Sequence, residues 1–347
     1  MVCYLKLQLP TFLLIYTGGT IGMMKDFDSG ALKAFDFKKL LQKIPELKQL
    51  DCNIETVSFD KPIDSSNMNI EQWQLIGSII EKNYVAYDGF VVLHGSDTMS
   101  YSASALSFML ENLDKPVVFT GSQLPIGDLR TDAKENLITA IQIASLQANG
   151  SPVLREVGLY FEYKLYRGNR TTKINAEHFK AFASPNCDAL VESGVHLNIN
   201  SKAFFTNNVA KRLVVHKNFD DNVVILKMFP GINANVLRSI ISIPNLKGIV
   251  LETYGSGNAP NEKWFLEIIE SAIKNGLQIV NVTQCSGGSV SMGHYETSTK
   301  LKEIGVISGK DITTESAITK LMYLLGANVA TAQFKIIFET SLRGEME

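Results

Sequence analysis

Two threonines flank a pair of glycines in the segment Tyr16–Gly22, YTGGTIG, directly after the apolar run 12–16. Glycine permits a tight turn and lets a ligand approach the backbone, and a neighbouring hydroxyl places a reactive oxygen at the same point. Thr17 and Thr20 are therefore candidate nucleophiles for acyl transfer. That reaction also needs a proton acceptor and hydrogen-bond donors for the oxyanion.

A second hydroxyl and a carboxylate, Ser96 and Asp97, follow the apolar run 89–94 in HGSDT, where Thr98 is expected to cap the next helix. His94 lies two residues before Ser96, so a Ser-His-Asp triad is an alternative. The chain has no G-x-S-x-G elbow, however. A histidine bonded into the strand-to-loop bend is the favoured interpretation. Lys173, in YRGNRTTKINAEHF, could act as a base if burial or neighbours lowered its pKa, although spacing alone does not choose the base.

Phosphate and metal chemistry are not expected. TGGTIG lacks the G-x-G-x-x-G pattern, and no G-x-x-x-x-G-K-[ST] occurs in the chain. The four cysteines include no C-x-x-C pair and the five histidines no H-E-x-x-H, so neither a metal centre nor a disulfide framework is predicted. Dispersed thiols suit a reducing cytoplasm.

The bulk properties are those of a globular protein with room for two domains. Of the 347 residues, 45% are hydrophobic and 20% charged. With 33 basic and 35 acidic residues and no basic block, nucleic acid is not an expected partner. The first sixteen residues match a signal peptide only weakly, so none is expected there. No apolar segment reaches the length of a membrane span.

Apolar, β-branched runs alternate with segments whose apolar residues recur at helical spacing, which predicts a parallel sheet covered on both faces. The strands are expected within 12–16, 89–95, 116–122, 157–163, 222–229, 247–254 and 276–283, and the helices within 70–84, 102–113, 131–147 and 261–276. The pattern weakens between about 185 and 220, which we interpret as the connection between a larger and a smaller domain.

Three turns rich in hydroxyls and glycine follow three of the predicted strands. They are TGGT at 17–20, HGSDT at 94–98 and TGSQLP at 120–125. Ligands of open α/β sheets bind beyond the carboxyl ends of the strands. The three turns are therefore expected to share one crevice.

Taken together, these stretches resemble the bacterial-type L-asparaginase family, and most closely its cytoplasmic type I branch. The resemblance extends over nearly the whole chain in the family's order. It rests on YTGGTIG (16–22), HGSDTMSYSASALSFMLENL (94–113), RGNRTTK (167–173), DSSNM (64–68), FTGSQLP (119–125), YGSGNAP (254–260), NVTQCSGG (281–288) and LRGEME (342–347).

The resemblance implies hydrolysis of L-asparagine to L-aspartate and ammonia without a cofactor. It also implies an α/β fold with a larger flavodoxin-like N-terminal domain and a smaller α/β C-terminal domain. We place these domains at 1–192 and 220–347, joined by a linker at 193–219. Family members are homodimers or dimer-based homotetramers.

By resemblance, Thr20 is the nucleophile, whereas Thr17 is a structural hydroxyl of the turn. Ser96 would activate the nucleophile or water with Lys173 as its proton partner, and Asp97 would bind the α-ammonium group of the substrate.

The loop Asp64, Ser65 and Ser66 matches the family segment that holds the α-carboxylate and α-amino ends of the substrate. Backbone N–H groups of that loop are able to receive the carboxylate. Backbone amides near Ser96 are expected to serve as oxyanion donors.

The chain departs from the family pattern at several positions. Ser96 stands where threonine is usual, which keeps the hydroxyl but loses a methyl group that restricts the rotamer. Ala31 falls near the place of a loop tyrosine found in many members. Tyr295 matches a tyrosine that in some cytosolic members completes the site across a subunit interface.

Thr172 and Cys285 match a separate effector site at which asparagine activates some type I enzymes. Glu252 stands there in place of an arginine and would repel the carboxylate of the effector. The same allosteric control is therefore not expected.

Other functions remain open at this point. A non-catalytic amino-acid-binding or regulatory protein could use the same fold, although binding alone would not need Thr20, Asp97 and Lys173 together. A glutaminase is also open, because one extra methylene is worth only about 1–3 kcal/mol in a pocket. An amidotransferase subunit would be expected to carry a basic patch or an appended domain, and the sequence has neither.

Overall fold

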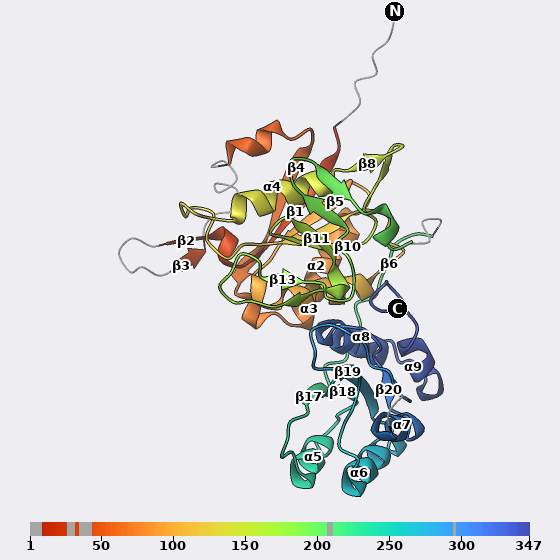
Figure 1. The fold of residues 1–347 in the computed structure, drawn as a ribbon. Helices are drawn as coiled ribbons and strands as arrows, with labels where there is room; N and C mark the ends of the chain where they lie inside the picture. The colour runs from red at the N-terminus through yellow and green to blue at the C-terminus, as the bar shows by residue number, and fades with distance from the viewer. Residues whose placement is uncertain (1–8, 26–31, 35–43, 207–210, 294–295) are drawn as a thin grey trace, which may run out of the picture.

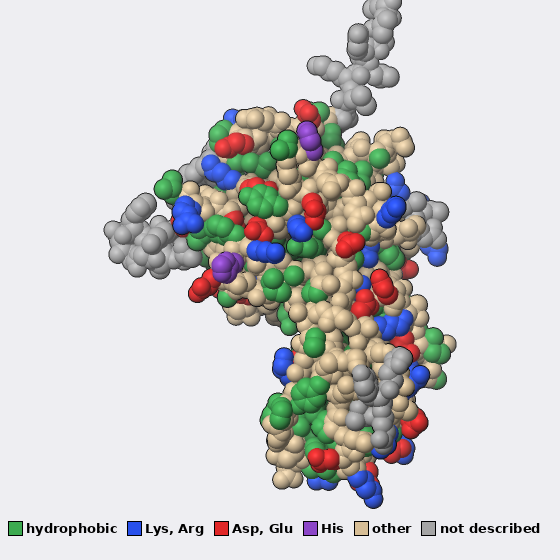
Figure 2. All heavy atoms as spheres, in the orientation of Figure 1, with side chains coloured by type: hydrophobic (Ala, Val, Ile, Leu, Met, Phe, Trp, Pro, Cys, Tyr) green, Lys and Arg blue, Asp and Glu red, His purple; other side chains and the backbone are tan. Residues whose placement is uncertain are grey.

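The computed structural model describes residues 9–25, 32–34, 44–206, 211–293 and 296–347. Figure 1 shows two lobes, a larger one built from the N-terminal part of the chain and a smaller one built from the C-terminal part. The C-terminus lies where the lobes meet, beside helix α8 (Thr314–Gly326). On the face drawn in Figure 2, basic and acidic side chains are interspersed over both lobes.

The larger lobe contains an eight-stranded sheet in the order β15-β14-β11-β10-β7-β5-β1-β4. Five neighbouring strands are parallel: β4 (Asn53–Ile63), β1 (Thr11–Gly18), β5 (Gly89–Leu93), β7 (Val117–Thr120) and β10 (Val157–Phe161). Counted along the chain, their spatial order is 2-1-3-4-5, the flavodoxin arrangement. The predicted parallel sheet is thus confirmed, with an antiparallel extension made of β11 (Lys164–Arg167), β14 (Val191–Ser193) and β15 (Leu197–Ile199).

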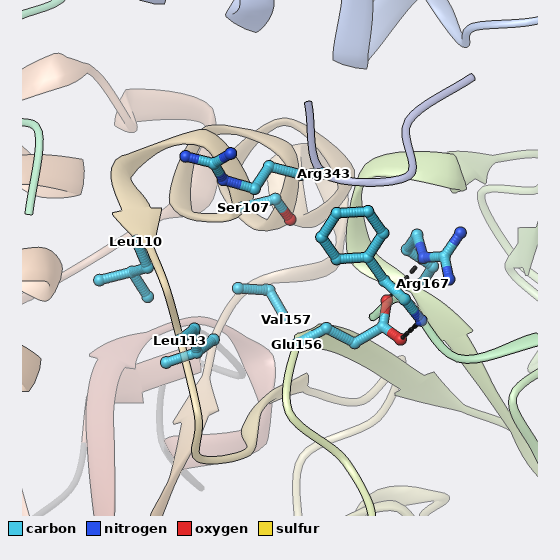
Figure 3. A pocket seen from close by; sticks show the side chains of 8 residues that line it. Ser107, Leu110, Leu113, Glu156, Val157, Arg167 and Arg343 are labelled. Atoms are coloured by element: carbon cyan, nitrogen blue, oxygen red, sulfur yellow. Dashed lines mark hydrogen bonds and ion pairs between the residues drawn. The ribbon is translucent and has the colours of Figure 1, made fainter. Parts of the chain in front are cut away.

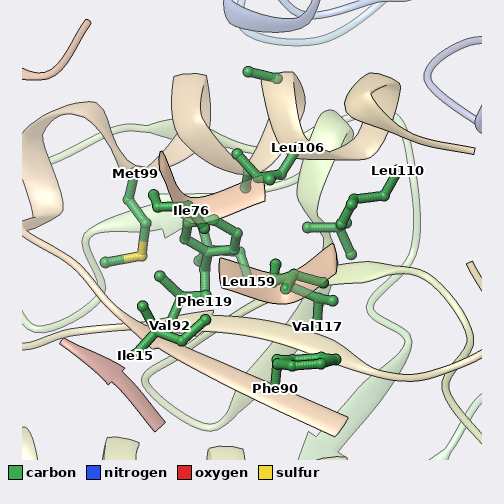
Figure 4. Packing of buried hydrophobic residues seen from close by; sticks show 14 of the residues in the cluster. Ile15, Ile76, Phe90, Val92, Met99, Leu106, Leu110, Val117, Phe119 and Leu159 are labelled. Carbon is green, nitrogen blue, oxygen red and sulfur yellow. The ribbon is translucent and has the colours of Figure 1, made fainter. Parts of the chain in front are cut away.

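Both faces of this sheet are covered, which is why its central strands are mostly apolar and buried. Leu13 and Ile15 of β1 face one side and pack in a cluster with α2 (Ile70–Asn83) and α3 (Met99–Met109), shown in Figure 4. Leu14 and Tyr16 face the other side and pack in a cluster with α4 (Ala133–Ala144). Alternation within one buried strand therefore serves two separate cores.

The helix predicted at 102–113 is wrong at both ends. Helix α3 begins at Met99 and stops at Met109, because Leu110–Glu111 form the short strand β6. Strand β6 pairs with β16 (Val214–Val215), about a hundred residues later in the chain. The other three helices lie within their predicted ranges, and α2 opens with a capping box between Asn69 and Gln72.

The smaller lobe has a four-stranded parallel sheet in the order β17-β18-β19-β20. Its strands are β17 (Val223–Lys227), β18 (Gly248–Thr253), β19 (Gln278–Thr283) and β20 (Ile307–Ser308), and its other helices are α5 (Ala234–Ile241), α6 (Lys263–Lys274), α7 (Glu296–Glu303) and α9 (Thr331–Phe338). Helix α8 packs against α3 and so joins the two lobes.

The range 193–219, predicted as a linker, contains two strands that pair with strands of the larger lobe. Strand β15 continues the large sheet as far as Ile199, and β16 pairs with β6. The large sheet therefore extends past residue 192, and the division of the chain at that residue stays a prediction.

Short elements complete the described fold. They are β2 (Met23–Lys25), β3 (Leu32–Ala34), β8 (Gln147–Ala148), β9 (Ser151–Pro152), β12 (Thr172–Lys173) and β13 (Phe182–Ala183), and the 3-10 helices η1 (Thr20–Gly22), η2 (Pro45–Gln49), η3 (Ser65–Asn67), η4 (Ser96–Thr98), η5 (Gly168–Arg170) and η6 (Ser201–Ala203). None of the helices in the described ranges has both the length and the apolar character needed to cross a membrane.

Candidate active site

The turns after β1 and β5 meet where the strand order of the large sheet reverses. Strand β1 lies between β4 on one side and β5 on the other, so chain order runs in opposite directions from this point. Crevices that bind ligands form at such switch points. Helix η1 begins at Thr20, and η4 begins at Ser96.

The glycines of TGGT allow three loops to touch. Gly18 and Gly19 have φ of +134° and +84°, a region that side chains disfavour. A Cβ atom at Gly18 would lie 2.0 Å from the Ile63 carbonyl oxygen, and one at Gly19 would lie 2.5 Å from the Cα of Gly95. The glycine pair is thus needed for backbone contact with the ends of β4 and β5.

The two threonines of the turn differ in their surroundings. Thr17 is buried, and its hydroxyl donates a 2.9 Å hydrogen bond to the Leu93 carbonyl, which ties the end of β1 to the end of β5. Thr20 is only partly buried and opens η1. A structural role for Thr17 agrees with this contact, and the hydroxyl of Thr20 is the more accessible of the two.

Lys173 joins Ser96 and Asp97, although it lies 76 residues beyond Asp97 in the chain. Its Nζ is 2.9 Å from Ser96 Oγ and 2.6 Å from Asp97 Oδ1. The lysine side chain is 16% exposed and the Asp97 side chain 65%. A largely enclosed cation therefore holds a carboxylate that remains open to a ligand, and the contact is charge-assisted.

The loop at Asp64–Ser66 is held ready beside these groups. Asp64 Oδ1 accepts 2.9 Å hydrogen bonds from both the backbone N–H and the hydroxyl of Ser66. Both bonds lower the pKa of the Asp64 carboxyl, and the bond from the backbone N–H has the larger effect. Ser65 is buried, and its carbonyl accepts a 2.7 Å bond from the Thr98 hydroxyl. Thr98 is the N-cap residue of α3, as predicted, but its side chain makes no cap bond and instead links η4 to η3.

His94 does not contact Ser96 in a Ser-His-Asp triad. It is fully buried, with Nδ1 2.7 Å from the Gly95 carbonyl and Nε2 2.8 Å from the Ser102 hydroxyl. Burial lowers the pKa of His94 to about 4. The imidazole is therefore neutral near pH 7 and fastens the bend after β5, in agreement with the favoured interpretation.

Gln123 is a further residue of the candidate site, and the sequence did not predict a role for it. It lies in the TGSQLP turn after β7, and its Oε1 accepts a 3.1 Å hydrogen bond from Ser96 Oγ. The signal for Gln123 in the sequence was the position of its turn, which follows a predicted strand at the same sheet edge as the TGGT and HGSDT turns. Its contact with Ser96 depends on tertiary geometry that spacing does not reveal.

This geometry provides a hydroxyl held by a lysine, an accessible carboxylate and a partly buried threonine on a glycine turn, which together suit acyl transfer. A family model described as the N-terminal domain of asparaginases matches residues 11–205. A second, described as the glutaminase/asparaginase C-terminal domain, matches residues 222–338. The chain belongs to the asparaginase family.

Relatives of this asparaginase-family chain match it along nearly its full length. L-asparaginase 1 of Escherichia coli is 41% identical over 98% of this chain and 99% of that protein. The 60 kDa lysophospholipase of Mus musculus is 40% identical over 96% of this chain, but only 62% of that protein is covered. The crystal structure of L-asparaginase I from Vibrio cholerae has a TM-score of 0.89 at 39% identity and covers 97% of this chain and 99% of that chain.

In this member of the family, the segment that carries Lys173 is anchored by buried ion pairs. Arg167 Nε contacts Glu156 at 2.6 Å, and Arg170 contacts Asp311 of the smaller lobe at 2.7 Å. Figure 3 shows Arg167 and Glu156 beside a cavity of about 10 Å³. That volume suits about one water molecule and is too small for an amino acid.

The three residues predicted for an effector site, Thr172, Glu252 and Cys285, line one cavity of about 310 Å³ that Lys173 also borders. The Thr172 hydroxyl donates a 2.6 Å bond to Glu315, and Thr314 donates a 2.7 Å bond to Glu252. Burial raises the pKa of the Glu315 carboxyl. The cavity thus presents two carboxylates.

Two further predicted positions, Ala31 and Tyr295, lie outside the described residues. Among the residues that the structure does describe, no group of three or more His, Cys, Asp and Glu side chains is arranged to hold a metal ion. Three of the four cysteines fall in the described ranges, and these are free thiols.

Proposed function

We propose that this chain is an L-asparaginase that hydrolyses L-asparagine to L-aspartate and ammonia without a cofactor. The observation that carries the proposal is the position of Lys173 Nζ, 2.9 Å from Ser96 Oγ and 2.6 Å from Asp97 Oδ1, at the edge where the Thr20 turn meets Gly95. Family membership and the full-length match to L-asparaginase 1 of Escherichia coli support the substrate.

In the proposed reaction, Thr20 Oγ attacks the side-chain amide carbon of asparagine. Ser96 takes the Thr20 hydroxyl proton as it gives its own to Lys173, which acts as the neutral amine; Lys173 then protonates the leaving nitrogen, the C–N bond breaks and ammonia departs. Water then adds to the aspartyl ester, the ester bond breaks, and a proton of that water passes to Thr20 Oγ to restore its hydroxyl. We assign the backbone amides near Ser96, where η4 begins, as the donors to the oxyanion.

Substrate recognition is assigned to the Asp97 carboxylate and to the loop formed by Asp64, Ser65 and Ser66. Asp97, more than half exposed, would receive the α-ammonium group and share its charge with Lys173. Asp64, Ser65 and Ser66 would hold the α-carboxylate and α-amino ends. The two bonds from Ser66 to Asp64 keep that loop preformed, which lowers the ordering cost of binding.

The first test measures ammonia release from L-asparagine and L-glutamine by wild type, Thr20→Ala and Thr20→Ser. Removing a nucleophile costs at least about 10³-fold in kcat. We expect release from asparagine by wild type, loss with Thr20→Ala and partial retention with Thr20→Ser.

Fatty-acid release from a lysophospholipid, measured in parallel, addresses the activity named for the mouse relative. If wild type released ammonia from neither amide yet bound asparagine in calorimetry, the chain would be an amino-acid-binding protein on this fold. Glutamine must be tested because one extra methylene supplies only about 10–200-fold discrimination in a pocket. Ammonia release from glutamine and asparagine at equal kcat/KM would make the protein a glutaminase-asparaginase.

We also propose a homo-oligomer, either a dimer or a dimer of dimers, in which Tyr295 completes the neighbouring site. The free thiols at Cys52, Cys187 and Cys285 support a cytoplasmic location. Asparagine activation through Thr172, Glu252 and Cys285 is not proposed, because the effector carboxylate would face two acidic side chains.

A further inference from the structure

Gln123 and Lys173 both form a hydrogen bond with the hydroxyl of Ser96. We propose that Gln123 is a positioning residue that fixes the direction of the Ser96 hydroxyl, an inference that rests on the proposed function. Its Oε1 accepts from Ser96 Oγ at 3.1 Å, whereas Lys173 Nζ donates to the same oxygen at 2.9 Å. Ser96 Oγ is thereby bonded on two sides.

The orientation of the Gln123 amide is fixed by its other contacts. Its Nε2 lies 3.1 Å from the carbonyl oxygens of both Ala176 and His178, which can only accept. The nitrogen must therefore face this loop, and the oxygen must face Ser96. The backbone N–H of Gln123 also donates to the Asp132 carboxylate, at 3.0 and 3.2 Å to its two oxygens. Both the backbone and the side chain of this glutamine are thus held.

These contacts determine where the proton of Ser96 lies. A lysine ammonium group has only donors, so Ser96 Oγ uses a lone pair toward Lys173. Its own proton then points to Gln123, the acceptor that the structure places on it. The Gln123 bond thus keeps the resting Ser96 oxygen beside Lys173 Nζ, and in the proposed transfer the hydroxyl proton turns from Gln123 to the neutral amine of Lys173.

Serine makes this restraint necessary. A threonine has a β-methyl group that restricts χ1, and serine lacks it. The Gln123 bond supplies the missing restraint from outside the residue. Because the loop at Ala176 and His178 follows Lys173 directly in the chain, the same amide also sets the position of the lysine segment relative to Ser96.

The test is Gln123→Leu, measured as kcat and KM for L-asparagine with the unfolding midpoint recorded alongside. We expect about a tenfold fall in kcat, equivalent to one neutral hydrogen bond, with KM changed less than twofold. The matched control is Gln74→Leu. Gln74 Nε2 donates to the Lys217 carbonyl at 2.9 Å on α2, outside the site. The control should keep the wild-type kcat.

The same substitution in a Ser96→Thr background separates positioning from general support. If Gln123 acts by restraining the hydroxyl, the β-branched side chain replaces that restraint and the loss falls to about threefold or less. Equal losses in both backgrounds would overturn the proposal, as would a wild-type kcat in Gln123→Leu. Should Gln123→Leu lower the unfolding midpoint, Gln123→Met takes its place as an unbranched variant of similar length.

The outcomes also separate this inference from the proposed function. A wild type that releases no ammonia would defeat the proposed function itself. An active wild type whose kcat is insensitive to Gln123→Leu would defeat only the positioning role.

Discussion

The contact between Gly19 and Gly95 makes Gly19→Ala an informative substitution. Gly19 has φ +84° and ψ 171°, a region occupied essentially by glycine alone, and placing alanine there costs about 1–3 kcal/mol. The new Cβ would also lie 2.5 Å from both the Cα and the N of Gly95. These are backbone atoms, so the turn and the loop must separate by about 1 Å to reach ordinary contact, which adds about 1–3 kcal/mol of overpacking strain.

Gly150→Ala is the matched control. Gly150 also has positive φ, +75°, but a Cβ there would meet nothing within 4 Å, and the residue lies in the β8–β9 hairpin away from the site. Its unfolding free energy should fall by about 1–2 kcal/mol from the backbone conformation alone. Its kcat/KM should equal that of wild type.

For Gly19→Ala we expect a fall in unfolding free energy of about 2–6 kcal/mol, the sum of the two costs. We also expect about a 100-fold fall in kcat/KM, because a displacement of 1 Å between reacting groups has an effect of that size. Urea unfolding and ammonia release at subsaturating asparagine measure the two quantities. If Gly19→Ala matched Gly150→Ala in both, the contact between these turns would not set the geometry of the site.

Two further predictions concern pH and the acidic cavity. The pKa of His94 is about 4 in the folded chain against an ordinary 6.5, so the unfolded chain binds more protons between these values. Unfolding free energy should therefore fall by up to about 1.4 kcal/mol per unit as pH drops from 6.5 to 4, and urea unfolding of His94→Gln should show a flatter slope in that window; an unchanged slope would contradict this. Initial rates against asparagine concentration should be hyperbolic, because Glu252 stands at the effector position and repels the α-carboxylate of an effector. A sigmoidal curve that becomes hyperbolic in Glu252→Gln would refute that reasoning.

Strands buried on both faces were predictable because their sequences are apolar throughout. The run 89–93 became β5 for this reason, and the 157–163 run contains β10. The antiparallel extension was missed because β14 and β15 are three residues each and partly exposed, so neither periodicity nor hydrophobicity marks them. Helix α3 was placed wrongly because its end is set by pairing between β6 and β16, a contact that local sequence does not encode.

Candidate site residues could be named from the sequence where a strand end carries a distinctive turn, or where the resemblance supplied a position. Thr20, Ser96 and Lys173 belong to these groups. Gln123 and Thr98 were not assigned their contacts, because each acts through a carbonyl or hydroxyl that only the folded chain brings near. A glutamine in a turn has no sequence signature that separates an orienting amide from a solvated one.

The origin of Lys173 explains why the candidate site needs both lobes. Thr20 and Ser96 come from the ends of adjacent strands, so the sheet itself sets their separation. Lys173 comes instead from the short strand β12, outside that sheet, and its position must be fixed by other contacts. Two of these come from the smaller lobe: Asp311 holds Arg170 at 2.7 Å, and Glu315 at the start of α8 accepts from Thr172 at 2.6 Å. The smaller lobe therefore acts as the support that holds the proposed proton carrier against the hydroxyl of the larger one.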